Sequence, residues 1–139
     1  MSLSEEEVKI IVGLEMEKAN RTYEAALIMV KNEHWESAAN RLYYALFHAV
    51  NALLIHDGHR VNTHKGSHAL FGKYYIKTGK LPRLYSSIYQ KLEAIRDEGD
   101  YNWAYNVTPE DVQEKIVPAK EMIDTISSLV KEQIINNKI

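Results

Sequence analysis

Residues 38–49 read AANRLYYALFHA, and this stretch decides the fold. Its apolar side chains recur at steps of three and four residues, which indicates one face of an α-helix. The apolar stripe comprises Trp35, Ala39, Leu42, Leu46, Ala49 and Leu53. Beside it are small residues that would let a neighbouring helix approach closely, namely Ala38, Ala45 and Ala52. We predict a helix from near Trp35 to near Gly58, because glycine readily adopts the left-handed conformation that ends a helix.

The same helical period extends over the rest of the chain, and the few glycines and prolines fall between the periodic segments. A short turn at residues 32–34 makes the first two helices antiparallel. The other predicted helices are Ser4 to Lys31, a short one that follows His64 and ends at Thr78-Gly79, Pro82 to Gly99, and one that begins at Thr108-Pro109. We therefore predict an all-α fold, an antiparallel four-helix up-and-down bundle with an additional helix, formed by residues 1–139 as a single domain.

Composition restricts the function. The chain has 139 residues, enough for one core, and it has no cysteine, which excludes disulfides, a thiolate nucleophile and a cysteine zinc site. Its apolar runs are too short to span a membrane, and its acidic start is unlike a signal peptide, so we expect a cytoplasmic protein with no membrane partner. The formal charge of −2 does not attract nucleic acid, so any contact with RNA requires a local basic patch.

Arg41 and His48 form a candidate catalytic pair. Residues seven apart return to nearly the same helix face, about 10 Å apart along the axis. An arginine can clamp a phosphate while a histidine transfers a proton, which is what metal-independent cleavage of RNA requires. The alternative is structural: Arg41 pairs with a carboxylate of a neighbouring helix, and His48 forms a hydrogen bond at a helix contact. Spacing alone favours this alternative.

Three stretches together resemble a known family. Residues 41–49 read RLYYALFHA, residues 64–66 read HKG ahead of Phe71, and residues 96–101 read RDEGDY. In this order they resemble the HEPN family, in particular a small uncharacterised subfamily with a YYA-x-F-H helix. The resemblance extends over roughly residues 19–126.

This resemblance implies a fold, partners and an activity. It implies a four-helix core with an appended helix, a homodimer, and a place beside a minimal nucleotidyltransferase in prokaryotic toxin-antitoxin or defence systems. Active relatives resemble metal-independent endoribonucleases whose motif is Arg, four to six residues, then His. Arg41 and His48 fit that spacing. In related toxins the motif lies at the end of a later helix, where this chain has Asp100 in place of the histidine.

Two functions therefore remain open: a HEPN-type partner-binding and RNA-binding module, which the Asp100 substitution favours, and a metal-independent endoribonuclease. The catalytic candidates are Arg41 and His48. The candidate binding residues are Tyr44, His64, Arg96, Asp100 and Tyr101. Arg96 has a structural alternative, an ion-pair network that fixes the following loop.

Two other groups of residues are weaker candidates. The aromatics Tyr101, Trp103 and Tyr105 could stack on bases, but closure of the core is the commoner role in such a connection. His64 and His68 stand four apart in a run of histidines and could share a helix face and bind a divalent metal, but we expect His64 to cap or pack at the start of a helix. We expect no cofactor and name no metal ligand.

Overall fold

The computed structural model describes residues 3–61 and 63–137, with side chains except those of 100–101 and 132–137. Over these residues the chain forms five α-helices and one π-helical turn and contains no strand, which confirms the all-α prediction. The elements are α1 (Glu5–Lys31), α2 (Trp35–His56), α3 (His64–Phe71), η1 (Gly72–Ile76), α4 (Arg83–Tyr101) and α5 (Pro109–Asn137). None of the described helices is long and apolar enough to cross a membrane.

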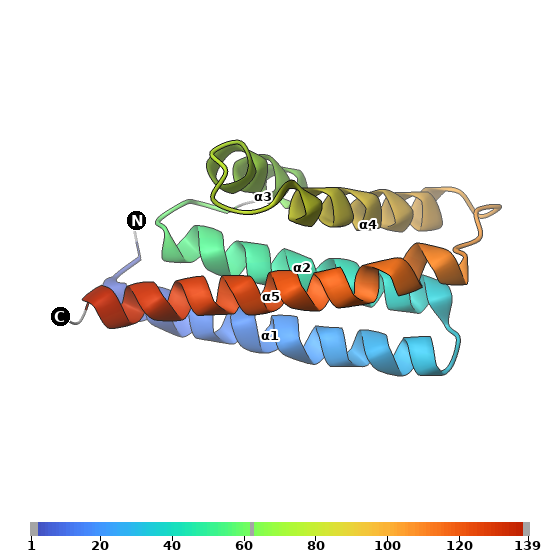
Figure 1. Ribbon diagram of the computed structural model, residues 1–139, viewed down its shortest axis with the longest axis horizontal. Coiled ribbons are helices and arrows are strands. Elements are labelled where there is room, and N and C mark those ends of the chain that lie inside the picture. The colour runs from blue at the N-terminus through green and yellow to red at the C-terminus, as the bar shows by residue number, and fades with distance from the viewer. Residues whose placement is uncertain (1–2, 62, 138–139) are drawn as a thin grey trace.

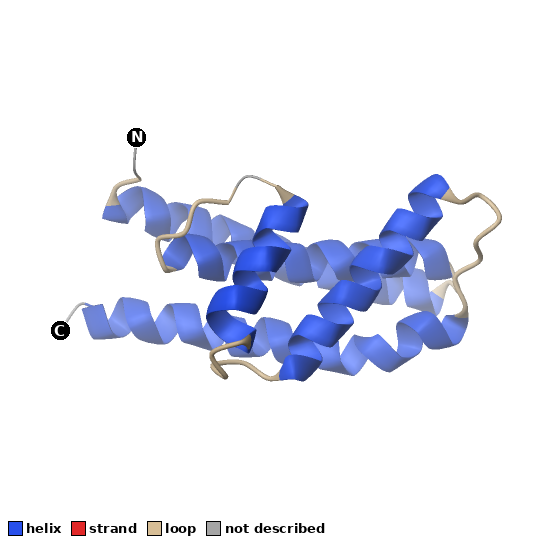
Figure 2. Cartoon of the chain, turned by 90° about the horizontal axis from the view of Figure 1, so that it is seen from above, coloured by secondary structure: helices blue, strands red, loops and turns tan. Residues whose placement is uncertain are grey.

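Helix α2 is the centre of the fold. It contacts α1, α3, α4 and α5 (Figure 1). The helices α1, α2, α4 and α5 alternate in direction along the long axis, which is the predicted up-and-down arrangement (Figure 1). The additional helix is α3 with η1, and α3 and α4 cross obliquely over the other three helices (Figure 2). This crossing places the C-terminal half of α4 beside the N-terminal half of α2.

Local sequence signals set most of the helix starts. Ser4 caps α1, since its hydroxyl accepts a hydrogen bond from the Glu7 backbone at 3.1 Å and the Glu7 carboxylate accepts one from the Ser4 backbone at 3.0 Å. Thr63 caps α3 in the same way by accepting a hydrogen bond from the Gly66 backbone at 2.8 Å. The third helix therefore begins at His64, which agrees with the prediction that His64 lies at the start of a helix. Its second half winds into the π-helical turn η1, which the apolar period does not encode.

Helix α4 differs from the prediction at both ends. Pro82 precedes the helix as its cap residue and is not its first helical residue. Gly99 does not end the helix either, and α4 continues to Tyr101. Among the described glycines only Gly58 and Gly79 have positive φ, at 87° and 80°, so Gly99 remains in the helical region. Glycine permits a left-handed cap but does not impose one.

The alanines beside the apolar stripe of α2 are part of the core. Ala38, Ala45 and Ala52 are each 0% exposed within the single chain. Because the chain's own helices already cover this face, the alanines give no support to a homodimer. The homodimer itself remains a prediction.

Thr108 provides a direct test of helix capping. Its hydroxyl accepts a hydrogen bond from the Asp111 backbone at 3.2 Å, and the Asp111 carboxylate accepts one from the Thr108 backbone at 3.0 Å. Thr108→Ala is expected to lower the free energy of unfolding by about 1 kcal/mol, measured by urea denaturation. Ser128→Ala, on an exposed position of α5, is the control and should stay within about 0.5 kcal/mol of the parent. Equal stabilities of the two variants would show that the cap contributes nothing.

Candidate phosphate-binding site

Three of the predicted site residues meet between α2, α3 and α4. Nη1 of Arg96, on α4, lies 3.4 Å from the Tyr44 hydroxyl and 3.4 Å from Nδ1 of His64. Tyr44 comes from the middle of α2 and His64 from the first turn of α3. Tyr43, beside Tyr44, donates its hydroxyl to the same His64 nitrogen at 2.8 Å. The crossing of α4 over α2 thus brings together residues 52 and 32 positions apart.

The contacts of His64 define its protonation. Arg96 can only donate, so Nδ1 of His64 must accept, and the imidazole proton of the neutral ring lies on Nε2. Burial lowers the pKa of His64, and the Arg96 charge lowers it further. Burial also raises the pKa of the Tyr43 hydroxyl, which therefore keeps its proton and donates it. The site holds a neutral histidine beside an arginine cation.

A stack of aromatic rings fixes the orientation of His64. The ring of Phe47 lies parallel to it, with centroids 4.1 Å apart and planes 8° apart. The fully buried Tyr43 ring also stacks on His64, with ring centres 5.9 Å apart, and on Tyr89, with ring centres 5.8 Å apart. The Arg96 guanidinium carbon lies 5.0 Å from the centre of the Tyr43 ring. These contacts restrict the ring and the guanidinium to one arrangement.

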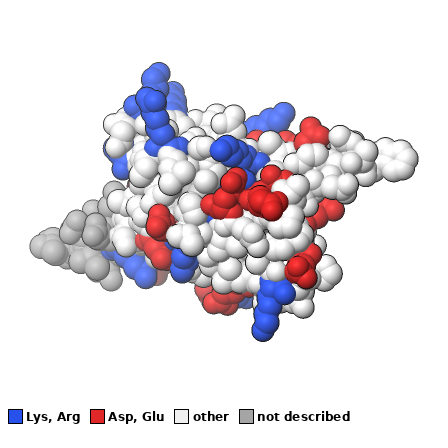
Figure 3. Space-filling model, turned by 45° about the vertical axis from the view of Figure 1, so that its right-hand side comes forward, with Lys and Arg blue, Asp and Glu red and all other residues white. Residues whose placement is uncertain are grey.

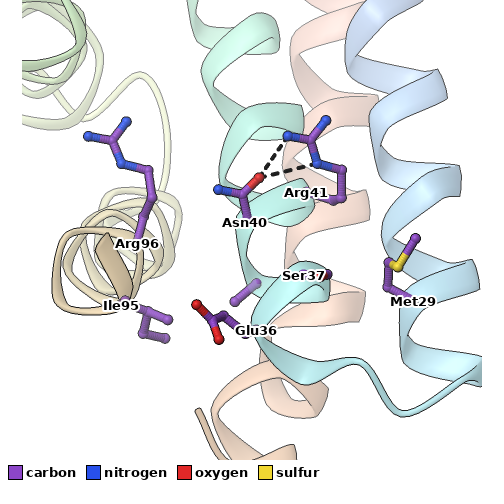
Figure 4. A pocket seen from close by; sticks show the side chains of 9 residues that line it. Met29, Glu36, Ser37, Asn40, Arg41, Ile95 and Arg96 are labelled. Atoms are coloured by element: carbon purple, nitrogen blue, oxygen red, sulfur yellow. Dashed lines mark hydrogen bonds between the residues drawn. The ribbon is translucent and has the colours of Figure 1, made fainter. Parts of the chain in front are cut away.

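Arg41 approaches the same cluster through the Tyr44 ring. Its guanidinium carbon lies 5.4 Å from the ring centre, and that of Arg96 lies 6.0 Å from it. Arg41 is held by Asn40, whose side-chain oxygen accepts hydrogen bonds from Nη2 at 2.7 Å and Nε at 3.3 Å. The side chain of Asn40 lies between the two arginines (Figure 4). The structural alternative predicted a carboxylate partner for Arg41, but the observed partner is this neutral amide.

An open pocket of about 340 Å³ adjoins these arginines (Figure 4). Its lining comes from α1, α2 and α4, namely Met29, Glu36, Ser37, Ala39, Asn40, Arg41, Ile95, Arg96 and Gly99. Glu36 contributes a carboxylate to the wall, and Asp97 forms an ion pair with Arg96 at 3.1 Å. The pocket lining therefore has two guanidinium groups, the Asn40 amide and the Ser37 hydroxyl as donors, while the Glu36 carboxylate opposes an anion.

His48 lies at the contact between α1 and α2. Its Nδ1 is 3.0 Å from the Glu15 carboxylate, and both side chains are 19% exposed. This is the hydrogen-bonded helix contact that the structural alternative predicted for His48. Its ring centre is 6.5 Å from that of Tyr44, so His48 borders the cluster, but its hydrogen bond within the described part of the chain is to Glu15.

The other candidates are dispersed. The side chains of Asp100 and Tyr101 lie outside the described part of the chain. Tyr105 is half-buried against the core as predicted, whereas Trp103 is 100% exposed, so the prediction that it closes the core is wrong. Trp103 lies in a seven-residue connection between α4 and α5, and no described helix covers it.

The two histidines that stand four apart engage different groups. His64 has the contacts described above, while His68 lies 3.1 Å from the Glu93 carboxylate and stacks on Tyr89 at 4.6 Å. The described residues contain no group of three or more His, Asp or Glu side chains arranged to hold a metal ion.

Sequence reasoning missed Tyr43, Asn40 and Glu15. The Tyr43-Tyr44 pair was quoted as a motif, but only the second tyrosine was assigned a role. One residue of such a pair faces the core, and a core tyrosine needs a partner for its hydroxyl, which was the available signal. Nothing local identifies Glu15, because it contacts His48 across 33 residues.

His64 should titrate below an ordinary histidine. Its pKa, followed by the NMR shifts of the ring protons, is expected to lie below the usual value and to rise toward it in Arg96→Gln. Because the unfolded chain binds that proton more readily, the contribution of His64 to stability is complete above the ordinary histidine pKa and is lost as the pH falls through the lowered one. The control Arg21→Gln, at an exposed position of α1, should leave the titration of His64 unchanged. Titration of His64 at or above the usual value would contradict this assignment.

Comparison with known proteins gives one consistent result. The HEPN domain family matches residues 14–130. A UPF0332 protein of Thermotoga maritima is 34% identical over 115 residues, which cover 83% of this chain and 87% of that one. A protein of Methanocaldococcus jannaschii named "Putative toxin MJ0605" is 30% identical over 127 residues, 91% of each chain, and "Putative toxin MJ0142" of the same organism is 28% identical over 98 residues, 70% of this chain and 67% of that one. With a match over most of the fold and the site-bearing helices, this chain belongs to the HEPN domain family.

Proposed function

We propose that this chain is a toxin-type HEPN protein that binds RNA and holds one backbone phosphate in the pocket between α2 and α4. The observation that carries this proposal is the placement of two guanidinium groups, of Arg41 and Arg96, 5.4 Å and 6.0 Å from the same Tyr44 ring beside an open pocket. A planar guanidinium group can bind two phosphate oxygens at once, and the Tyr44 ring lies beside both guanidinium groups.

The surroundings of Arg96 suit an exchange of anions. Asp97 neutralises Arg96 in the free protein, and its side chain is 44% exposed. An exposed ion pair contributes little to stability, so a phosphate can replace the carboxylate at small cost. The lining also contains the Ser37 hydroxyl, which is a further donor. The two guanidinium groups, with a neutral His64 beside Arg96, therefore favour an anionic ligand.

We also propose an association with a minimal nucleotidyltransferase that acts as the antitoxin. Two relatives carry the word toxin in their names, and a toxin requires a neutralising partner. Co-expression of this chain with such a nucleotidyltransferase, followed by affinity capture of either one, tests the association. Failure of the two proteins to co-purify at low salt would overturn it.

A second candidate function is metal-independent cleavage of RNA. The observation that favours it is a neutral imidazole 3.4 Å from a guanidinium group, which provides a proton-transfer group beside a phosphate clamp. On this geometry His64 is better placed for proton transfer than His48, because His64 contacts the Arg96 guanidinium, whereas His48 lies against Glu15 at the contact between α1 and α2. Arg41 and Arg96 would hold the scissile phosphate.

One set of variants tests both functions. Binding of a labelled single-stranded RNA, measured by fluorescence anisotropy in EDTA, is expected to weaken on the order of tenfold in Arg41→Ala and in Arg96→Ala. Arg21→Ala, at an exposed position of α1 outside the pocket, is the control and should bind as the parent does. Unchanged affinity in both pocket variants would overturn the phosphate site.

Cleavage is assayed in the same buffer. If the chain is a ribonuclease, His64→Ala should abolish cleavage and His48→Ala should reduce it less, with circular dichroism confirming that both variants fold. Loss of cleavage in His48→Ala alone would return the catalytic role to the Arg41 and His48 pair. Equal RNA cleavage by the parent and all variants would identify a contaminant and leave an RNA-binding module.

A further inference from the structure

Charge is distributed unevenly along the chain. Residues 58–92 contain seven of the 17 lysines and arginines and none of the 19 aspartates and glutamates. The rest of the chain therefore has ten basic and 19 acidic residues. The overall charge of −2 hides this separation, and the local basic patch that RNA contact requires is present in a segment distant from the Arg41 and Arg96 pocket.

The fold gathers this segment at one end of the molecule. We define the basic surface as the exposed residues Arg60, Lys73, Lys77, Lys80 and Arg83. They lie on η1 and on the segments that precede it and follow it. Figure 3 shows Lys and Arg side chains collected over the upper left of the molecule, where η1 and the adjoining turn lie, with no acidic side chain among them on this face.

Ring contacts and backbone hydrogen bonds connect the parts of this surface. The ring of His59 stacks on that of Tyr74 at 4.2 Å, which holds the segment around Arg60 against η1. The Lys73 ammonium lies 5.2 Å from the centre of the same Tyr74 ring. The turn after η1 folds back, because the Leu81 backbone donates to the Tyr75 carbonyl at 2.8 Å and that of Gly79 to Ile76 at 3.0 Å. Lys77 and Lys80 are therefore held close to η1.

The carboxylates that flank the segment are already engaged. Asp57 accepts hydrogen bonds from His56 at 2.8 Å and from the Tyr75 hydroxyl. Glu93 lies 3.1 Å from His68. Among the described residues, neither carboxylate forms an ion pair with a lysine or arginine of the basic surface. The positive charge there is thus directed to solvent and is available to an external anion.

The composition of the surface favours RNA over a protein partner. Lysine is depleted in protein interfaces, whereas it is a main contact of nucleic-acid phosphates. In residues 58–92 Leu84 is the only large apolar side chain counted as exposed among those described, so the surface offers no apolar centre for a protein interface. Tyr74 and His59 supply a stacked pair of rings among the lysines, which is the combination that single-stranded RNA binds.

We propose that the basic surface binds the backbone of single-stranded RNA and supplies most of the salt-dependent affinity of this protein. The surface ends at Arg83, the first residue of α4, and Arg96 lies 13 residues further along that helix, about 20 Å away. One RNA strand can therefore contact the basic surface and the Arg96 pocket together. This inference shares the RNA ligand of the proposed function but depends on different residues.

The test compares two charge-neutralised triple variants. The first is Lys73→Gln, Lys77→Gln and Lys80→Gln, in the basic surface. The control is Lys9→Gln, Lys18→Gln and Lys31→Gln, three exposed lysines of α1, so both variants have the same net charge. The probe is labelled single-stranded RNA with 2′-O-methyl groups, which cannot be cleaved through the 2′-hydroxyl. Anisotropy gives the dissociation constant at several salt concentrations.

The expected result separates this inference from the proposed function. The surface variant should bind on the order of tenfold more weakly at low salt and should lose about 2 from the slope of log affinity against log salt, while the control keeps the parental slope. A surface variant that binds like the control overturns the basic surface, even if Arg41→Ala and Arg96→Ala still weaken binding. The reverse pattern overturns the pocket alone. No binding by the parent at low salt overturns both.

Discussion

Replacing Tyr43 by alanine is expected to lower the free energy of unfolding by about 3–5 kcal/mol, one of the largest effects of any single substitution in this chain. Tyr43 is 0% exposed, and its ring stacks on Phe47, His64 and Tyr89. Alanine leaves a cavity in the centre of the bundle and removes the support of His64. Urea denaturation followed by circular dichroism measures the loss.

Tyr43→Phe separates packing from hydrogen bonding. It keeps the ring and removes only the donor to His64, so its cost should be about 1 kcal/mol. Tyr85→Phe, which removes a hydroxyl bonded to Thr125 at 3.1 Å, is the matched control and should leave the pKa of His64 unchanged. The role of Tyr43 would be refuted if Tyr43→Ala were no less stable than Tyr43→Phe.

Ala45→Leu is expected to destabilise the chain by about 1–3 kcal/mol, because leucine overfills a closely packed position. Ala45 is 0% exposed and lies seven residues from Ala38 and from Ala52, on the same side of α2. The chain should lose stability whether it is a monomer or an oligomer, since its own helices cover this face.

Ala94→Leu is the control for that substitution. Ala94 is exposed on α4, and its replacement should change the unfolding free energy by no more than about 0.5 kcal/mol. Size-exclusion chromatography with light scattering, run on both variants, adds a second readout. If Ala45→Leu kept the stability of the parent but disrupted an oligomer, the alanines of α2 would form an interface between chains after all.

The candidate site shows how far prediction from sequence reached. Tyr44, His64 and Arg96 were named from their family motifs, and the structure places them in contact. His48 was named on the same grounds, but it lies against Glu15 of α1. Helical spacing correctly put Arg41 and His48 on related faces of α2, yet a face does not specify which helix covers it. The basic surface went unnoticed because the net charge averages two opposite regions.

The sequence by itself determined the helices of this protein, because the signals are local. An apolar period, the caps at Ser4 and Thr108 and the turn at residues 32–34 all involve groups within four positions of one another. Only the tertiary structure decided which side chains share a site. Arg96 meets Tyr44 and His64 because α4 crosses α2 at one register, and that register results from the packing of whole helix faces.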